Sequence, residues 1–186
     1  GLTGWSTIYA LTRALQIEFG LSSPADNFGN ATVAAFKQRY PNGIMQQSSN
    51  SRIHAIIQGA LWCKGYSTGT YDITGDFDDG TAYAVKMLKE DAGLENPNSI
   101  VTLNVMKGLL SMDQYRLVNS GSPTIRMIQQ KLNRRYERFI GMVPCDGLYG
   151  REMNKALIVV LQVIIGAEAD GIFGNGTKNN CPILPD

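Results

Sequence analysis

The chain has 186 residues and a mass of 20.3 kDa, and 44% of its residues are hydrophobic, which is enough for one or more packed cores. Its net charge of +1 gives no basic footprint, so we expect neither nucleic acid nor an anionic membrane as a partner. No stretch approaches the ~18 apolar residues that a membrane-spanning helix needs, and the start of the chain lacks the pattern of a secretory leader.

Several segments carry apolar residues at every third or fourth position, which is typical of amphipathic helices. In chain order these segments follow Thr7, follow Thr32, span 53–61, follow Thr81, span 100–110, span 125–132 and follow Met153. Pro41 ends the second of them. The polar, turn-rich stretches 42–50 and 113–122 are expected linkers. The pattern predicts an all-α fold.

A short motif recurs immediately before several of these helices. Its clearest copy is Asp-Gly-Ile-Phe-Gly-Asn-Gly-Thr at 170–177, and further copies lie at 146–153, 74–81, 25–32 and 1–7. Gly1, Gly75 and Gly147 follow one another at intervals of 74 and 72 residues, and Asp26 lies 145 residues before Gly171. The motifs therefore form two interleaved series within a repeat of roughly 70 residues.

The motif predicts a loop that begins a helix. Asp-Gly favours a tight turn, because Gly accepts positive φ and Asp bonds nearby backbone. The aromatic residue that follows is expected in the core, as for Phe28, Phe77 and Phe173. The hydroxyl residue at the end of the motif can satisfy a free N–H at the helix start.

Three helical units account for the chain. We expect a first unit at 1–48 that lacks its first helix, a complete second unit at 49–118, and a third unit at 119–186 whose last helix is missing or short. Each complete unit should contain three helices and two motif loops. The incomplete outer units indicate that the chain is part of a longer protein.

The chain resembles the peptidoglycan-binding domain type 1 family over nearly its whole length. The matching residues are Gln58, Leu61, Gly65 and Tyr66, then Gln129, Leu132 and Tyr136, then Asp146, Tyr149 and Gly150, then 170–177, with the Gly-Leu pairs at 20–21 and 93–94. The amino-acid sequence of residues 2–16 is similar to that of tandem binding units found beside a glycoside-hydrolase-like domain in proteins of Gram-positive bacteria. Asp26-Asn27, the acidic insertion around Asp72 and Met153 depart from the family pattern.

The resemblance implies tandem three-helix units that recognise cell-wall peptidoglycan, through either its glycan strand or its stem peptide. It also implies an extracellular location at the bacterial cell wall and a covalently linked catalytic domain in the parent protein. Under this interpretation the chain itself anchors a wall hydrolase.

The chain offers little for catalysis or for a metal. His54 is the only histidine and lies at a helix start, where we expect a surface or capping residue. One histidine with three scattered cysteines does not make a zinc site. Asp72, Asp76, Asp78 and Asp79 do not fit a calcium loop, and we interpret them as a solvated helix-start loop. We therefore expect no cofactor, no metal and no enzyme activity in this chain.

Candidate ligand-binding residues lie at the ends of the first helices and in the adjacent loops, where aromatic faces and a few polar groups can hold sugars or short peptides. They are Trp62, Tyr66, Tyr71 and Asp72 in the second unit, and Arg134, Arg135, Tyr136 and Tyr149 in the third. Arg135 could pair with a stem-peptide carboxylate. The alternative for Tyr66, Tyr136 and Tyr149 is that they close the small cores.

The leading functional hypothesis is non-catalytic binding of peptidoglycan, with weak sites in series gaining avidity on a polymer. The alternative is a structural or protein–protein assembly module. The two hypotheses differ in whether the chain binds insoluble peptidoglycan.

Overall fold

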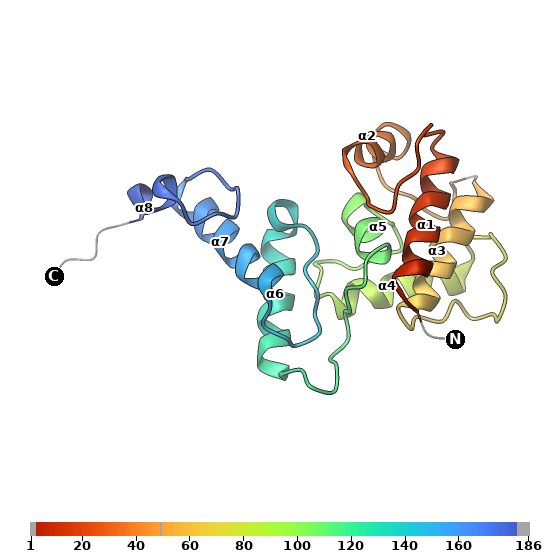
Figure 1. Ribbon diagram of the computed structural model, residues 1–186. Helices are drawn as coiled ribbons and strands as arrows, with labels where there is room; N and C mark the ends of the chain where they lie inside the picture. Colours follow the sequence, from red (N-terminus) through yellow and green to blue (C-terminus); the bar gives the residue numbers. More distant parts are fainter. Residues whose placement is uncertain (1–2, 49, 182–186) are drawn as a thin grey trace. The chain divides into compact units, whose positions relative to one another are not determined.

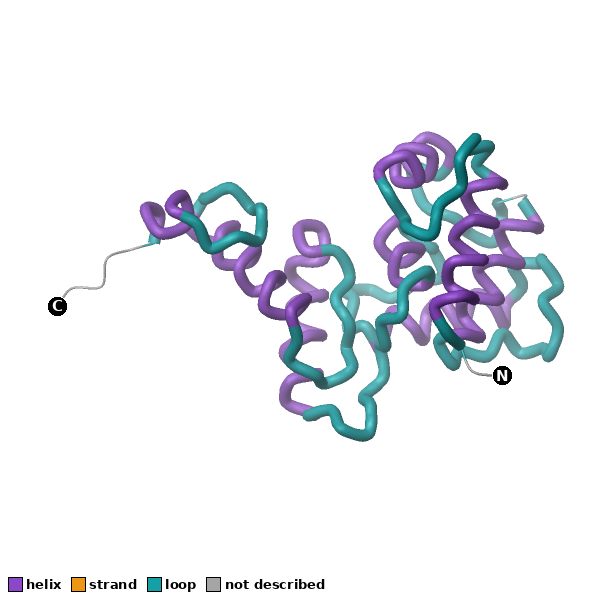
Figure 2. Tube along the Cα trace, in the orientation of Figure 1, coloured by secondary structure: helices purple, strands orange, loops and turns teal. Residues whose placement is uncertain are grey.

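A computed structural model of the chain describes residues 3–48 and 50–181. Within these residues the protein is all-α, as predicted, with loops between the helices (Figures 1 and 2). One isolated bridge pairs Ile44 with Val101. None of the described helices is long and apolar enough to cross a membrane. The helices are α1 (Trp5–Glu18), α2 (Asn30–Arg39), α3 (Ser51–Cys63), α4 (Asp79–Asp91), α5 (Leu103–Leu109), α6 (Pro123–Ile140), α7 (Arg151–Ile165) and α8 (Asn175–Asn180).

By packing, the chain divides into two compact units. Unit 1 contains residues 1–91 and 96–115, and unit 2 contains residues 92–95 and 116–186. The first two predicted repeats share unit 1, because α1 packs against α3 and α2 packs against α5. The boundaries of the sequence repeats, after residues 48 and 118, stay a prediction. In the structure, the first two repeats pack together as unit 1.

Unit 1 has the larger core. α3 lies against α1, α4 and α5, and the side chains between them are fully buried, including Leu15, Ile57, Leu61, Leu88 and Met106. Burying an aliphatic side chain of this size contributes about 1.5–3 kcal/mol. The apolar stripes predicted from the sequence are therefore the surfaces that meet here.

Unit 2 has a smaller core between α6 and α7. Leu132, Val143, Ala156 and Val160 form it, and Tyr136 packs on its edge. α8 contacts α7 and has six residues.

Buried glutamines fasten the motif loops to the helices that precede them. The side chain of Gln58 on α3 accepts a hydrogen bond from Gly75 N at 2.9 Å. Its Nε2 lies 2.9 Å from the Asp76 carbonyl and 3.0 Å from Thr81 Oγ1, at the start of α4. This side chain thus fixes the turn and also reaches the start of the next helix. We call the bonding of a buried glutamine to the backbone of a motif loop the glutamine staple.

Three more glutamines make the same staple. The backbone N–H groups of Ala25, Gly147 and Gly171 donate to Gln16, Gln129 and Gln162 respectively, at 2.6, 2.9 and 2.9 Å. Gln16 also donates to Thr32 Oγ1 at 3.0 Å, and Gln162 donates to Thr177 Oγ1 at 2.9 Å. All four glutamines are at most 2% exposed.

The glycines of three motifs form turns of the predicted kind, after Asp146 and Asp170 in two of them and after Thr74 in the third. Gly75, Gly147 and Gly171 have φ of 77°, 82° and 75°, which glycine adopts without strain. Asp146 accepts from Leu148 N and from Gln129, and Asp170 accepts from Ile172 N and from Gln162. The bond from the Ile172 backbone N–H, followed by the bond from the Gln162 side chain, lowers the pKa of Asp170 below its ordinary value.

The aromatic residues of the motifs differ in burial. Phe77 is buried, as predicted, and Phe28 is half-buried. The prediction is wrong for Phe173, which is 48% exposed. Phe173 lies directly before α8, a helix of six residues that packs mainly against α7. Such a short helix offers little surface to cover the Phe173 ring.

Replacing Gln58 with methionine should lower the free energy of unfolding of unit 1 by about 2–4 kcal/mol, because the Gly75 N–H would be left buried without an acceptor. Trp5 and Trp62 are the two tryptophans of the chain and both belong to unit 1, so denaturant titration followed by tryptophan fluorescence measures this loss. Gln38→Met, at an exposed position of α2, is the control and should change stability by less than about 0.5 kcal/mol. Equal effects of the two substitutions would contradict the staple.

Candidate functional site

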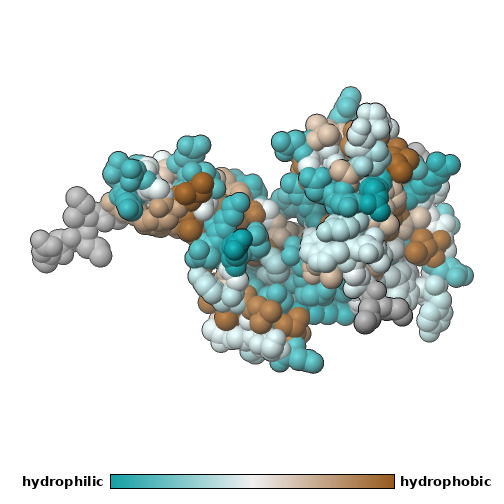
Figure 3. All heavy atoms as spheres, in the orientation of Figure 1, coloured by the Kyte–Doolittle hydropathy of each residue, from teal (hydrophilic) through white to brown (hydrophobic). Residues whose placement is uncertain are grey.

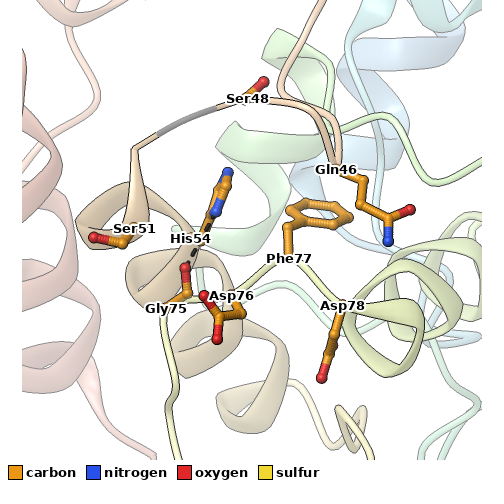
Figure 4. A pocket seen from close by; sticks show the side chains of 8 residues that line it. All are labelled: Gln46, Ser48, Ser51, His54, Gly75, Asp76, Phe77 and Asp78. Carbon is orange, nitrogen blue, oxygen red and sulfur yellow. Dashed lines mark hydrogen bonds between the residues drawn. The ribbon is translucent and has the colours of Figure 1, made fainter.

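A polar pocket of about 320 Å³ lies in unit 1 where α3 and α4 begin (Figure 4). We call it the α3 pocket. The staple of Gln58 brings its walls together, because it ties the loop before α4 to α3. The pocket is lined by Gln46, Ser48, Ser51, His54, Gly75, Asp76, Phe77 and Asp78.

His54 forms the inner wall of the α3 pocket. Its side chain is 5% exposed, so the prediction of a surface or capping residue is wrong. The loop that carries Gly75 and Phe77 folds back over the start of α3, and the Phe77 ring meets the imidazole edge-on at a centroid distance of 5.4 Å. Such a fold-back depends on contacts between distant residues, which helical periodicity does not report.

The hydrogen bonding of His54 defines its tautomer. Nδ1 lies 3.2 Å from the Gly75 carbonyl, which can only accept, so Nδ1 carries the hydrogen. Nε2 is buried and has no hydrogen-bond partner among the residues that the structure describes. Burial lowers the pKa of His54 below its ordinary value, and the Gly75 carbonyl and the charge of Asp76 only partly oppose this effect.

The acidic residues of the α3 pocket have different roles. Asp78 accepts a hydrogen bond from Thr81 N at 2.8 Å, caps α4, and points away from the imidazole in Figure 4. The Thr81 backbone N–H, followed by the Thr81 hydroxyl, lowers the pKa of Asp78. This agrees with the helix-start loop predicted for the acidic cluster. The Asp76 backbone N–H donates to Thr74 Oγ1 at 3.2 Å, which shapes the turn and leaves the carboxylate at the pocket rim.

The α3 pocket can bind a polar group but is poorly arranged for covalent chemistry. A serine nucleophile needs a base within hydrogen-bond distance. In the described part of the chain, neither Ser48 nor Ser51 is hydrogen-bonded to His54, whose Nδ1 is engaged by the backbone.

A second depression, of about 300 Å³, lies along α6 in unit 2, and we call it the α6 groove. Ser122 caps the start of this 18-residue helix, with Pro123 in its first turn. Buried Leu132 and partly exposed Ile128 supply its apolar surface. The groove is lined by Ile128, Lys131, Leu132, Arg134, Arg135 and Tyr136.

The α6 groove brings together three of the four ligand-binding residues predicted for the third repeat, namely Arg134, Arg135 and Tyr136. The fourth, Tyr149, is an exposed residue near the start of α7 that does not line the groove, and its hydroxyl donates to Asn154 Oδ1 at 3.1 Å. Tyr136 also packs on the core of unit 2, so it serves both the core and the groove.

The ligand-binding residues predicted for the second repeat, which belongs to unit 1, are not gathered in one pocket. Tyr66 is 2% exposed and its hydroxyl donates to Asp91 Oδ2 at 2.9 Å, so it closes the core and cannot offer its ring to a ligand. Trp62 is partly exposed and its indole N–H donates to Thr68 Oγ1 at 3.2 Å. Tyr71 is fully exposed and Asp72 is exposed beside it, and both lie in the long loop before α4.

The sequence analysis missed Ile128 and Lys131 in the α6 groove, and it missed the pocket around His54. Ile128, Lys131 and Arg135 lie three and four residues apart, a spacing that places side chains on one helix face and could have identified the groove. No comparable local signal marks the α3 pocket.

The ring of His54 should titrate below its ordinary pKa of about 6.5. Between the lowered pKa and 6.5 the unfolded chain binds a proton that the folded chain does not, so the free energy of unfolding should fall as the pH drops below 6.5. Because His54 is the only histidine, the NMR signal of its ring protons reports the pKa directly. A midpoint at or above 6.5 would contradict the burial argument.

Comparison with known proteins finds a family whose model is similar to part of the chain. Residues 118–182 match the family model "FadG/YbfG, PGDB-like domain". No solved structure matches the chain significantly.

Two proteins of Bacillus subtilis (strain 168), both described as uncharacterized, are similar to the whole chain. YbfG is 51% identical over 187 residues, which cover 99% of this chain and 25% of YbfG. FadG is 44% identical over 192 residues, which cover 99% of this chain and 32% of FadG. The chain thus spans a quarter to a third of the length of these relatives, and its residues 118–182 are similar to a peptidoglycan-binding-like domain of the FadG/YbfG kind.

Proposed function

We propose that the chain binds bacterial cell-wall peptidoglycan and does not act as an enzyme. The observation that carries this proposal is the PGDB-like match at 118–182, which includes the two staples made by Gln129 and Gln162. The same staple recurs at Gln16 and Gln58, outside the matched residues. This recurrence supports extending the peptidoglycan-binding interpretation to tandem units along the chain.

The α6 groove is the surface that best fits a wall fragment. Arg135 offers a guanidinium that can hold the carboxylate of a stem peptide in a bidentate pair. Ile128, Leu132 and Tyr136 lie beside it and offer apolar surface for a methyl group or a sugar face. A combination of apolar surface and one well-placed charge suits a short peptide better than a bare sugar strand.

The units of the chain gain from acting together. Shallow sites bind weakly, but a second contact on the same polymer is effectively intramolecular and raises the overall affinity. In the second predicted repeat, which belongs to unit 1, the exposed Trp62, Tyr71 and Asp72 are the residues we assign to such an additional contact.

The location and the parent protein follow from this function as further proposals. A peptidoglycan ligand requires an extracellular location at the cell wall. The similar proteins are three to four times longer than the aligned region, which leaves room for a linked glycoside-hydrolase-like catalytic domain.

One observation favours the alternative function of a protein–protein assembly module. Ile164, Ile172 and Phe173 expose about half or more of their side chains in unit 2. Figure 3 shows hydrophobic side chains as separate patches among hydrophilic ones on the visible face. Small separate patches of this kind are common on ordinary surfaces, so we rank assembly second.

The proposed function is tested by co-sedimentation with Gram-positive sacculi stripped of anionic polymers and proteins. The chain should pellet and saturate, and Arg135→Gln should weaken binding roughly tenfold, as expected for loss of a charged hydrogen bond. Lys37→Gln, at an exposed position of α2, removes the same charge in unit 1 and should leave binding unchanged. If the unmodified chain stays in the supernatant, peptidoglycan binding is rejected in favour of assembly.

A further inference from the structure

The cationic side chains of the protein are concentrated on α6. This helix carries five of the 17 lysines and arginines and one of the 16 acidic residues. The rest of the chain therefore has 12 cationic and 15 acidic side chains, an excess of negative charge. The near-neutral total hides a segregated charge, which the net charge used in the sequence analysis does not reveal.

Four of the five cations lie on one face of the helix. Lys131, Arg134, Arg135 and Arg138 are spaced by three, one and three residues, which places them along a single stripe. We call these four residues the basic stripe. Its ends are seven residues apart, or about 10 Å along the helix axis.

The basic stripe is not neutralised within the described part of the protein. All four side chains are exposed, and none of them forms an ion pair with a described residue. The Arg138 guanidinium lies 4.5 Å from the centre of the Phe139 ring, a contact that leaves its charge in place.

The basic stripe works against the stability of α6. Lys131 and Arg135, and likewise Arg134 and Arg138, are like charges four residues apart, an arrangement that destabilises a helix. A bound polyanion would relieve this repulsion. A single stem-peptide carboxylate at Arg135 would leave most of it unrelieved.

We infer that the basic stripe binds a phosphodiester polymer of the cell wall, of the poly(glycerol phosphate) type, beside the peptidoglycan contact. About 10 Å of helix can meet more than one phosphate of a flexible chain. Four cations on one helix, in a chain that is otherwise net negative, form too small a footprint for duplex nucleic acid, which favours a narrow polyanion.

This inference is separable from peptidoglycan binding by using two wall preparations. The chain should bind sacculi that retain their phosphodiester polymers several-fold more tightly than stripped sacculi, and it should bind purified poly(glycerol phosphate) in solution. Raising the salt from 50 to 200 mM should weaken the binding to that polymer roughly tenfold, as expected when a few phosphates release their counterions.

The matched variants are two double substitutions that each remove two positive charges. Lys131→Gln/Arg138→Gln should abolish the difference between the two wall preparations. Lys37→Gln/Lys86→Gln, at exposed positions of α2 and α4, should preserve it. Circular dichroism verifies that both variants remain folded.

Each outcome decides the matter. Equal binding of the unmodified chain to both preparations overturns the inference and leaves peptidoglycan binding intact. Binding to the purified polymer without binding to stripped sacculi supports the inference and rejects the proposed function. Equally tight binding to phosphatidylglycerol vesicles or to duplex DNA, at matched phosphate concentration, overturns the inference because it reveals unselective attraction to negative charge.

Discussion

The glutamine staple is the interaction on which the rest of the structure depends. A motif loop has backbone N–H and C=O groups that no regular structure pairs, and leaving them buried without partners would be costly. A glutamine amide both accepts and donates, so one side chain on a helix satisfies the turn and reaches the hydroxyl at the start of the next helix. Gln58 and Gln162 do this for loops of different length, with their turn glycines 17 and 9 residues further along the chain. The staple therefore fixes each loop whatever its length, which allows the surface of the loop to vary.

Where the staple glutamine is absent, another polar residue joins the helix to its loop. Lys89 lies near the end of α4, is buried, and donates to Asn98 Oδ1 at 2.6 Å in the loop that leads to α5. A long cationic side chain reaches further than glutamine but only donates, so it cannot accept from a turn N–H. The second loop of this repeat accordingly lacks the Asp-Gly turn found at 146–147 and 170–171.

The sequence predicts the parts of this structure that local rules control. The spacing of apolar residues predicts the helices, and the motif predicts the turns at Gly75, Gly147 and Gly171, because a glycine and a carboxylate act over two or three residues. His54 and Phe173 are assigned wrongly, since their burial depends on how far a loop folds back or on how short a neighbouring helix is. Of the two interpretations given for Tyr66, the structure agrees with closure of the core. Such contacts join residues far apart in sequence, and the period of a helix contains no information about them. Arg134, Arg135 and Tyr136 line one groove because a single helix brings them together, and their role in ligand binding stays a prediction.

The same helix serves the core and the candidate ligand surface, and this double use gives the groove its precision. Gln129 and Asn133 on α6 are buried, and Asn133 donates to the carbonyls of Ala92 and Val143 at 2.8 and 2.9 Å. These bonds fix the rotation of α6 about its axis and therefore the direction in which Arg135 and its neighbours project. A ligand that meets a fixed helix face does not have to order the backbone that carries its contacts, so less of the interaction free energy is lost on binding. The Gln129 staple on the same helix adds to these bonds, so a repeated sequence motif also helps to orient the exposed charges of the candidate surface.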